Sequence, residues 1–129
     1  MTFADPVSLV RAAIDGSTGL ETARVLDAAF TSGPMPVVHV HHLSGTADEV
    51  DRLDQVGVDV YHTTPTGPGS PSALLVASRI RDALVGTCRP TPVGLIDEVA
   101  VSAEPVTRPY VGLIEVASMV LDVTHRPIY

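Results

Sequence analysis

The feature that most constrains the fold is a change of hydrophobic period within residues 53–86. Residues 53–62 alternate between apolar and polar side chains, which predicts a half-buried strand. Residues 71–85 instead repeat small and apolar side chains at intervals of three and four, which predicts an amphipathic helix. The repeating side chains are Val56, Val58 and Val60 in the strand and Ala73, Ala77, Ile80 and Leu84 in the helix. A strand that leads into one such helix predicts a sheet with a helix across one face.

Turn-forming residues mark both ends of this helix. Ser70 is suited to the N-cap, Pro71 to the first helical position and Gly86 to the stop. Prolines and glycines in residues 63–69 exclude regular structure before the helix, and residues 89–92 predict a second break after it.

Three further strands complete the predicted sheet. Residues 37–43 and 53–62 are separated by a short acidic segment, residues 47–52, which favours an antiparallel pair. Residues 96–103 alternate, whereas residues 111–124 carry apolar side chains on both faces. We therefore expect the last strand to be central in its sheet or to be covered by a partner on its outer face.

The first third of the chain is less uniform. Asp5 and Pro6 predict the start of a short helix over residues 7–14. Residues 16–33 fit two structures: the spacing of a capping box, Thr18 to Glu21, favours a helix. A short strand over residues 23–26, followed by a loop, fits the same segment equally well.

Length and composition agree with one small core. A chain of 129 residues has the size of a single domain, which we take as residues 1–129. Aromatic residues make up 4% of the chain and Trp is absent, so the core must consist of Val, Leu, Ile and Ala. The predicted fold class is α/β of the α+β type: a small, mainly antiparallel sheet with one main amphipathic helix packed on it and a short N-terminal helix.

Charge and hydropathy exclude some classes of partner. The formal net charge is −7 and all basic residues are Arg, which argues against a protein that grips phosphate backbones. No apolar run reaches the roughly 18 residues that a membrane-spanning helix needs, and the first residues lack the pattern of a secretory signal. The sequence therefore predicts a soluble, intracellular chain without a membrane partner.

The histidines are the main candidates for a metal site. On a strand, His39 and His41 point to the same side about 7 Å apart, and His62 on the neighbouring strand is a conceivable third ligand. No paired-histidine or paired-cysteine metal motif accompanies them. We therefore expect these histidines to be polar residues on the less buried face of a strand, and expect no metal.

The chain offers little catalytic chemistry. Ser44 is not part of a nucleophile elbow, and the single cysteine, Cys88, is expected in a loop without a known signature around it. The loop of residues 66–70 precedes a helix as a phosphate loop does, but it has no Lys, and prolines remove backbone donors. The sequence predicts no catalytic residue, no cofactor and no enzymatic activity.

The order of elements resembles the tail terminator proteins of long-tailed bacteriophages, the group typified by the lambda tail terminator and often described as minor tail proteins in actinobacterial phages. The resemblance covers nearly the whole chain and is carried by a short N-terminal helix followed by four segments. These are the strand ending at Leu43-Ser44-Gly45, residues 51–61 with the loop and helix 72–84 that follow, Ile96-Asp97-Glu98-Val99 and residues 111–124.

This resemblance implies a structural virion protein without catalytic residues. It would form a ring, usually of six subunits, that caps the head-proximal end of the tail tube and stops its growth. Its partners would be further copies of the chain, the tail tube protein on one side and the head–tail connector on the other. DNA would pass through the lumen without specific binding, and a net charge of −7 per subunit is compatible with that passage. Assembly would take place in the host cytoplasm.

Two other functions remain open from the sequence. A head–tail joining protein, the neck or head-completion protein of the same virion, would have similar size and composition but different partners. A small metal-binding enzyme that uses His39, His41 and His62 is the alternative from another class.

Overall fold

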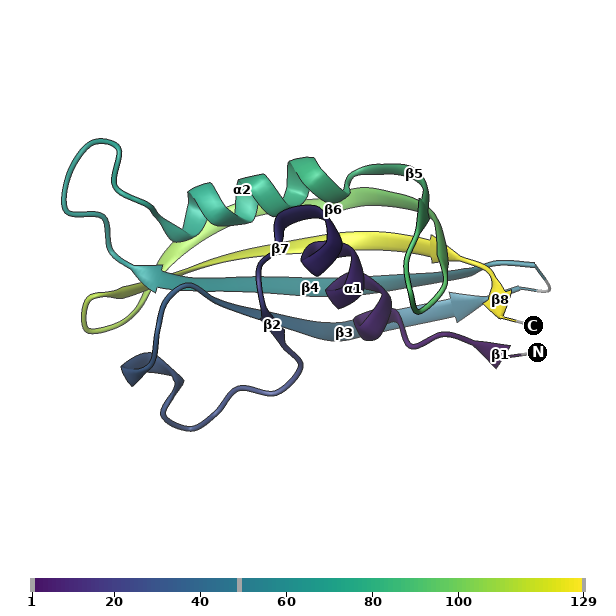
Figure 1. Cartoon of the computed structure of the whole chain (residues 1–129), viewed down its shortest axis with the longest axis horizontal. Helices are drawn as coiled ribbons and strands as arrows, with labels where there is room; N and C mark the ends of the chain where they lie inside the picture. Colours follow the sequence, from purple (N-terminus) through teal and green to yellow (C-terminus); the bar gives the residue numbers. More distant parts are fainter. Residues whose placement is uncertain (1, 49, 129) are drawn as a thin grey trace.

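The computed structural model describes residues 2–48 and 50–128 and shows a curled sheet with both α-helices on one face (Figure 1). The helices are α1 (Pro6–Thr18), the 3-10 helix η1 (Phe30–Ser32) and α2 (Ala73–Leu84). The strands are β1 (Thr2–Phe3), β2 (Thr22–Ala23), β3 (Val37–Ala47), β4 (Arg52–Thr63), β5 (Gly86–Pro90), β6 (Leu95–Val111), β7 (Ile114–His125) and β8 (Pro127–Ile128).

Six strands form the main sheet in the order β2-β3-β4-β7-β6-β5, and β1 pairs with β8 separately. All pairs are antiparallel except β2 with β3. This arrangement confirms the predicted α+β class, the mainly antiparallel sheet and the packed main helix, although the sheet is larger than expected. Among the described residues, no helix is long and apolar enough to cross a membrane.

The core lies between the sheet and the two helices. We call this side of the sheet the covered face, and the opposite side the open face. The predicted alternation of β4 is confirmed, since Val56, Val58 and Val60 are fully buried on the covered face. The predicted helical stripe is confirmed as well, and its members are all fully buried: Ala73, Ala77, Ile80 and Leu84.

β7 is central, as its apolar side chains on both faces predicted. It lies between β4 and β6, and it is buried by α2 on the covered face, where Met119 and Leu121 pack. The strand begins only at Ile114, however, so the predicted start at residue 111 is wrong. Gly112 adopts a φ of 56°, which allows the tight turn between β6 and β7.

The ends of α2 differ from the prediction. Ser72, not Ser70, is the N-cap, because its hydroxyl accepts a hydrogen bond from the backbone N–H of Leu75. Pro71 therefore precedes the helix instead of opening it. The helix ends at Leu84, and Gly86 begins β5 with a φ of 147°, a conformation that requires glycine.

The N-terminal helix is longer than residues 7–14. The Asp5 carboxylate caps it by accepting from the backbone N–H of Val7, as the sequence predicted, and Gly19 ends it in the left-handed conformation. Thr18 closes this helix and does not begin another. The rest of residues 16–33, the segment for which two structures were predicted, contains the two-residue strand β2 and the short helix η1. The strand alternative was therefore nearer to the structure, although the strand begins at Thr22.

Three further segments also differ from the prediction. β3 continues past Leu43 to Ala47, because a bulge between His42 and Ser44 absorbs one residue and pairing with β4 then resumes. Residues 86–90, placed partly in a break, form the edge strand β5, where a proline is tolerated. β6 extends to Val111 with several register shifts. Glu49, within the predicted acidic segment, lies outside the described residues.

Candidate functional site

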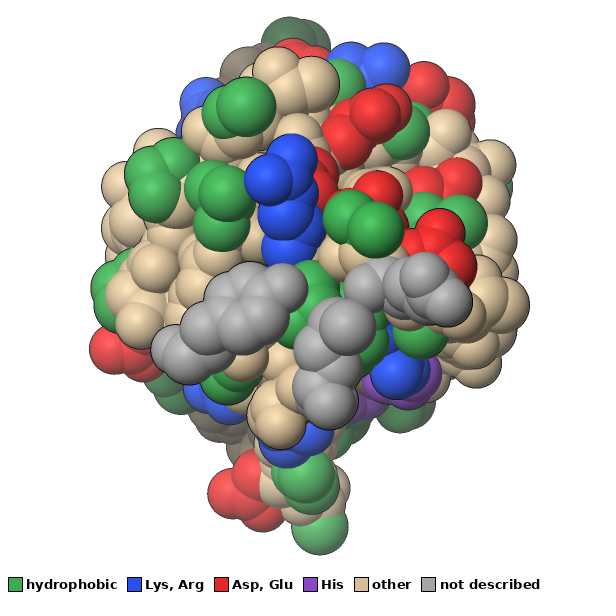
Figure 2. All heavy atoms as spheres, turned by 90° about the vertical axis from the view of Figure 1, so that its right-hand side faces the viewer, with side chains coloured by type: hydrophobic (Ala, Val, Ile, Leu, Met, Phe, Trp, Pro, Cys, Tyr) green, Lys and Arg blue, Asp and Glu red, His purple; other side chains and the backbone are tan. Residues whose placement is uncertain are grey.

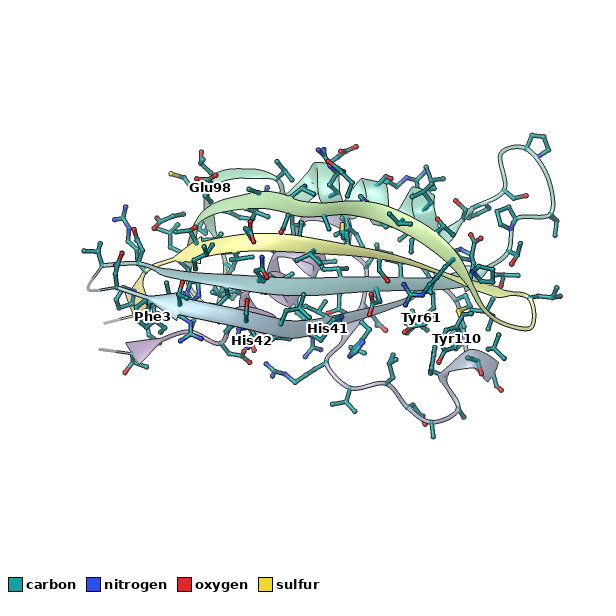
Figure 3. All side chains as sticks on the ribbon, turned by 180° about the vertical axis from the view of Figure 1, so that it is seen from behind. Phe3, His41, His42, Tyr61, Glu98 and Tyr110 are labelled. Carbon is teal, nitrogen blue, oxygen red and sulfur yellow. The ribbon has the colours of Figure 1, made fainter. Side chains whose placement is uncertain are left out.

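Two clusters of histidine and aspartate lie on opposite faces of the sheet. The first, which we call the Asp54 cluster, lies on the covered face and consists of His42, Arg52, Asp54 and His125. The second, which we call the His39 cluster, lies on the open face and consists of His39, His41 and Asp59. Figure 3 labels one histidine of each cluster, His42 and His41, along β3.

Asp54 accepts hydrogen bonds from three side chains. His42 Nε2 lies 2.7 Å from Oδ1, while His125 Nε2 at 2.7 Å and Arg52 Nε at 2.8 Å both contact Oδ2. Asp54 and His125 are both fully buried, with an exposed fraction of 0%. Gly45 lies opposite Asp54 on β3, where a Cβ would overlap the carboxylate and lie 2.7 Å from Arg52 Nη2.

These contacts determine the electrostatics of the Asp54 cluster. Burial by itself raises the pKa of Asp54, but the hydrogen bonds from Arg52, His125 and His42 outweigh it, so the pKa lies below its ordinary value. The hydrogen bond to Asp54 in turn raises the pKa of Arg52. Asp54 is therefore an ionised carboxylate whose acceptor positions are occupied by the protein itself, which is typical of a structural centre.

The carboxylate of the His39 cluster accepts fewer side-chain hydrogen bonds than Asp54 does. His39 and Asp59 are direct cross-strand neighbours, and His41 Nε2 lies 3.0 Å from Asp59 Oδ2. His39 Nδ1 lies 3.9 Å from the same oxygen. The two imidazole rings stack with centroids 5.1 Å apart. His41 is positioned over Gly57, where a Cβ would lie 2.6 Å from its Nε2.

The predicted proximity of His39 and His41 is thus confirmed, but His62 does not join them. Side chains alternate along β4, so His62 points to the covered face with Val60, whereas Asp59 points to the open face. The third potential ligand is Asp59. The alternation of β4 in the sequence already places Asp59 and His62 on opposite faces. Only the register of β3 with β4 shows that Asp59 lies opposite His39.

An aromatic cluster covers another part of the open face (Figure 3). The rings of Tyr61 and Tyr110 have centroids 5.0 Å apart, and Phe30 lies 4.8 Å from Tyr61. Burial, reinforced by the nearby Asp59 carboxylate, raises the pKa of Tyr61. Sequence reasoning missed this cluster because its three members come from η1, β4 and β6.

Several exposed apolar side chains lie at one end of the molecule, which we call the loop end and define as residues 64–72 and 106–113. Others, such as Leu53, Val93 and Ile128, lie outside it. The loop end lies on the left in Figure 1, opposite the chain termini. The backbone N–H of Thr64 donates to the carbonyl of Leu113 at 2.7 Å and so joins the two segments. The exposed large side chains of its second segment are Val106, Tyr110, Val111 and Leu113.

The opposite end carries a mixture of charges. Figure 2 shows hydrophobic, acidic and basic side chains interspersed over the end with the chain termini. Arg126 there contacts the Asp97 carboxylate at 3.0 Å. The basic side chains on this surface are therefore not clustered as the binding of a phosphate backbone requires.

The remaining catalytic candidates are scattered. Cys88 is exposed on the edge strand β5 and not in a loop, and Ser44 donates to Gln55 Oε1 at 3.2 Å on the paired strands β3 and β4. Within the described part of the chain, the side-chain hydrogen bonds of His42 and His125 go to Asp54, so neither histidine contacts a serine, threonine or cysteine as a general base would.

Comparison with protein-family models and with curated proteins found no match to this chain.

Proposed function

We propose that this chain is a structural virion protein, a tail terminator that forms a ring on the head-proximal end of a phage tail tube. Six copies would make the ring, stop polymerisation of the tube and present the docking surface for the head–tail connector. The chain would be assembled in the host cytoplasm and act through surface complementarity, without catalysis. DNA would cross the lumen without specific contacts.

The loop end is the observation that carries this proposal. Leu113 is 78% exposed at the tip of the long β6–β7 hairpin, next to other exposed apolar residues. Exposed apolar side chains grouped in this way mark protein–protein contact sites. The loop end rises from the central strands of the sheet, so a rigid scaffold holds the contact residues in place.

Two further features support the proposal. The order of helix, strand pair, loop, helix and strand pair is the one on which the resemblance to tail terminators rests. The net charge of −7 is suited to a lumen along which DNA slides, since like charges do not attract. Residues 44–47 pair with β4 as part of β3, so they are not an open loop available for subunit contacts.

The proposal is tested by a matched pair of charge substitutions. Leu113→Asp lies in the loop end, while Val25→Asp lies outside it at an almost identical exposure of 79%. Both variants should fold, because neither side chain is in the core. Negative-stain microscopy should show rings for the wild type and for Val25→Asp, but not for Leu113→Asp. Rings that form equally well in both variants would remove the loop end from the interface.

Deletion of the gene from its phage separates the possible virion roles. Tails that grow to uncontrolled length support termination. Tails of normal length that fail to attach to heads favour the head–tail joining protein instead. A normal yield of infectious particles would contradict both.

A further inference from the structure

We infer that His39, His41 and Asp59 form a binding site for a divalent transition metal ion of the Zn²⁺ type on the open face of the sheet. One potential ligand atom from each residue lies within 4.8 Å of the others. The three residues come from β3 and β4, whose pairing fixes their relative positions. This inference is independent of the proposed virion function and goes beyond it.

The hydrogen bonding of His39 leaves one ring nitrogen available. Its Nε2 lies 3.0 Å from the backbone carbonyl oxygen of Arg24. A carbonyl oxygen only accepts, so Nε2 carries the hydrogen, and in the neutral ring Nδ1 keeps its lone pair. A histidine that donates one N–H to a backbone carbonyl is the usual arrangement of a metal ligand, because the contact fixes both tautomer and ring orientation.

The free Nδ1 of His39 faces a carboxylate. It lies 3.9 Å from Asp59 Oδ2, so a lone pair and a negative oxygen approach one another. A cation between the two atoms would turn this repulsion into attraction. Around a tetrahedral Zn²⁺, ligand atoms about 2.0–2.2 Å from the metal are about 3.4 Å from each other. The observed 3.9 Å needs only a small adjustment.

His41 completes the donor set. Its Nε2 lies 3.0 Å from Asp59 Oδ2 and donates to it when no metal is bound, so metal binding through Nε2 would require the other tautomer, with the ring hydrogen on Nδ1. Stacking on His39 and the hydrogen bond to Asp59 favour this position of the His41 ring before any metal arrives. Preorganisation of this kind lowers the entropic cost of binding.

The composition of the cluster indicates which ions it would take. Two imidazole nitrogens and one carboxylate oxygen are ligands suited to Zn²⁺, and three protein ligands leave a fourth position for water. The side chains of His39, His41 and Asp59 are 20%, 32% and 18% exposed, so both the ion and the water can reach them. A bound ion would tie β3 to β4 and, through His39, to the segment that contains Arg24.

Zinc titration of the purified full chain tests the site. Titration calorimetry with ZnCl₂ should show one ion bound per chain. Affinity should fall at least about tenfold in Asp59→Asn and in His39→Ala, because each removes a ligand atom. His62→Ala is the matched control, since it removes a histidine from β4 on the other face, and its affinity should equal that of the wild type. Absence of binding to the wild type, or equal binding by Asp59→Asn, would overturn the inference.

A second measurement on the wild type avoids any effect of substitution on folding. In ¹⁵N-edited NMR spectra, Zn²⁺ should shift the ring nitrogens of His39 and His41 while leaving those of His125 unchanged. Shifts confined to His62, or shifts spread equally over all histidines, would contradict a site at the His39 cluster.

Discussion

Asp54 and Asp59 lie five residues apart on the same strand, and the odd interval places them on opposite faces of the sheet. Both carboxylates contact two histidines. Asp54 is fully buried and additionally bound by Arg52, whereas Asp59 is 18% exposed and lies 3.9 Å from one of its two histidines. The same residue types therefore produce two different centres. Burial and hydrogen bonds to both oxygens of Asp54 make the Asp54 cluster structural, while the His39 cluster retains the capacity to bind a ligand.

The largest effect should come from removing the buried carboxylate. Asp54→Ala leaves Arg52 and two histidines without their shared acceptor, and should lower the free energy of unfolding by about 3–5 kcal/mol. Urea unfolding followed by circular dichroism measures this loss. If the loss were below about 1 kcal/mol, the Asp54 cluster would not be a structural centre, and the contrast with Asp59 would disappear.

The glycines of the two clusters provide a sharper contrast. In Gly45→Ala, the new methyl group meets a buried carboxylate that cannot move away, so we expect a loss of about 1–3 kcal/mol. In Gly57→Ala, the methyl group meets the His41 ring, which is half-exposed and can rotate into solvent. Thermal melts should therefore show a clear decrease in Tm for the first variant and a small one for the second. Equal decreases would mean that the open face is as tightly packed as the covered face.

The acid dependence of stability should report on Asp54. Because the pKa of Asp54 in the folded protein is below its ordinary value, its ionised form stabilises the fold at neutral pH. That contribution is lost as the pH falls from about 4, the pKa of an unfolded Asp, through the lower folded value. Unfolding titrations between neutral pH and pH 2 should give a shallower decline for Asp54→Asn than for the wild type. An unchanged slope would show that Asp54 does not carry the acid sensitivity.

The smallest effect should come from Asp59→Asn. Its contacts are partly exposed, so the free energy of unfolding should change by less than about 1 kcal/mol without metal. In the presence of Zn²⁺, the wild type should gain stability that the variant does not gain, since a ligand that binds only the folded state stabilises it. Equal stabilisation of both proteins would place the ion elsewhere.

The sequence predicted what depends on local periodicity. The buried faces of β4 and α2 followed directly from their spacing of Val, Ala and Leu. The end of β3 at Leu43 was misplaced because a bulge interrupts the alternation without ending the pairing. The break predicted at residues 89–92 from its prolines was also partly wrong, because an edge strand such as β5 tolerates the loss of one backbone donor.

The clusters depend on register, which a single sequence does not contain. His39 and His41 share a face by alternation alone, so their proximity was predictable. Asp59 joins them only because β3 and β4 pair with His39 opposite Asp59. The contact between Asp54 and His125 spans 71 positions of the chain, and nothing near either residue indicates the other.

The pairing of β1 with β8 has a practical consequence for protein engineering. Thr2 lies directly opposite Ile128, so both ends of the described chain leave the fold side by side, away from the loop end (Figure 1). A fusion partner attached at either end of the described chain would therefore project from the end with the termini and leave the loop end accessible. The same proximity permits circular permutation: a short linker can join the ends of the described chain, and new termini can be opened within the exposed residues 65–69, which lie between the hydrogen bond of Thr64 and the N-cap Ser72.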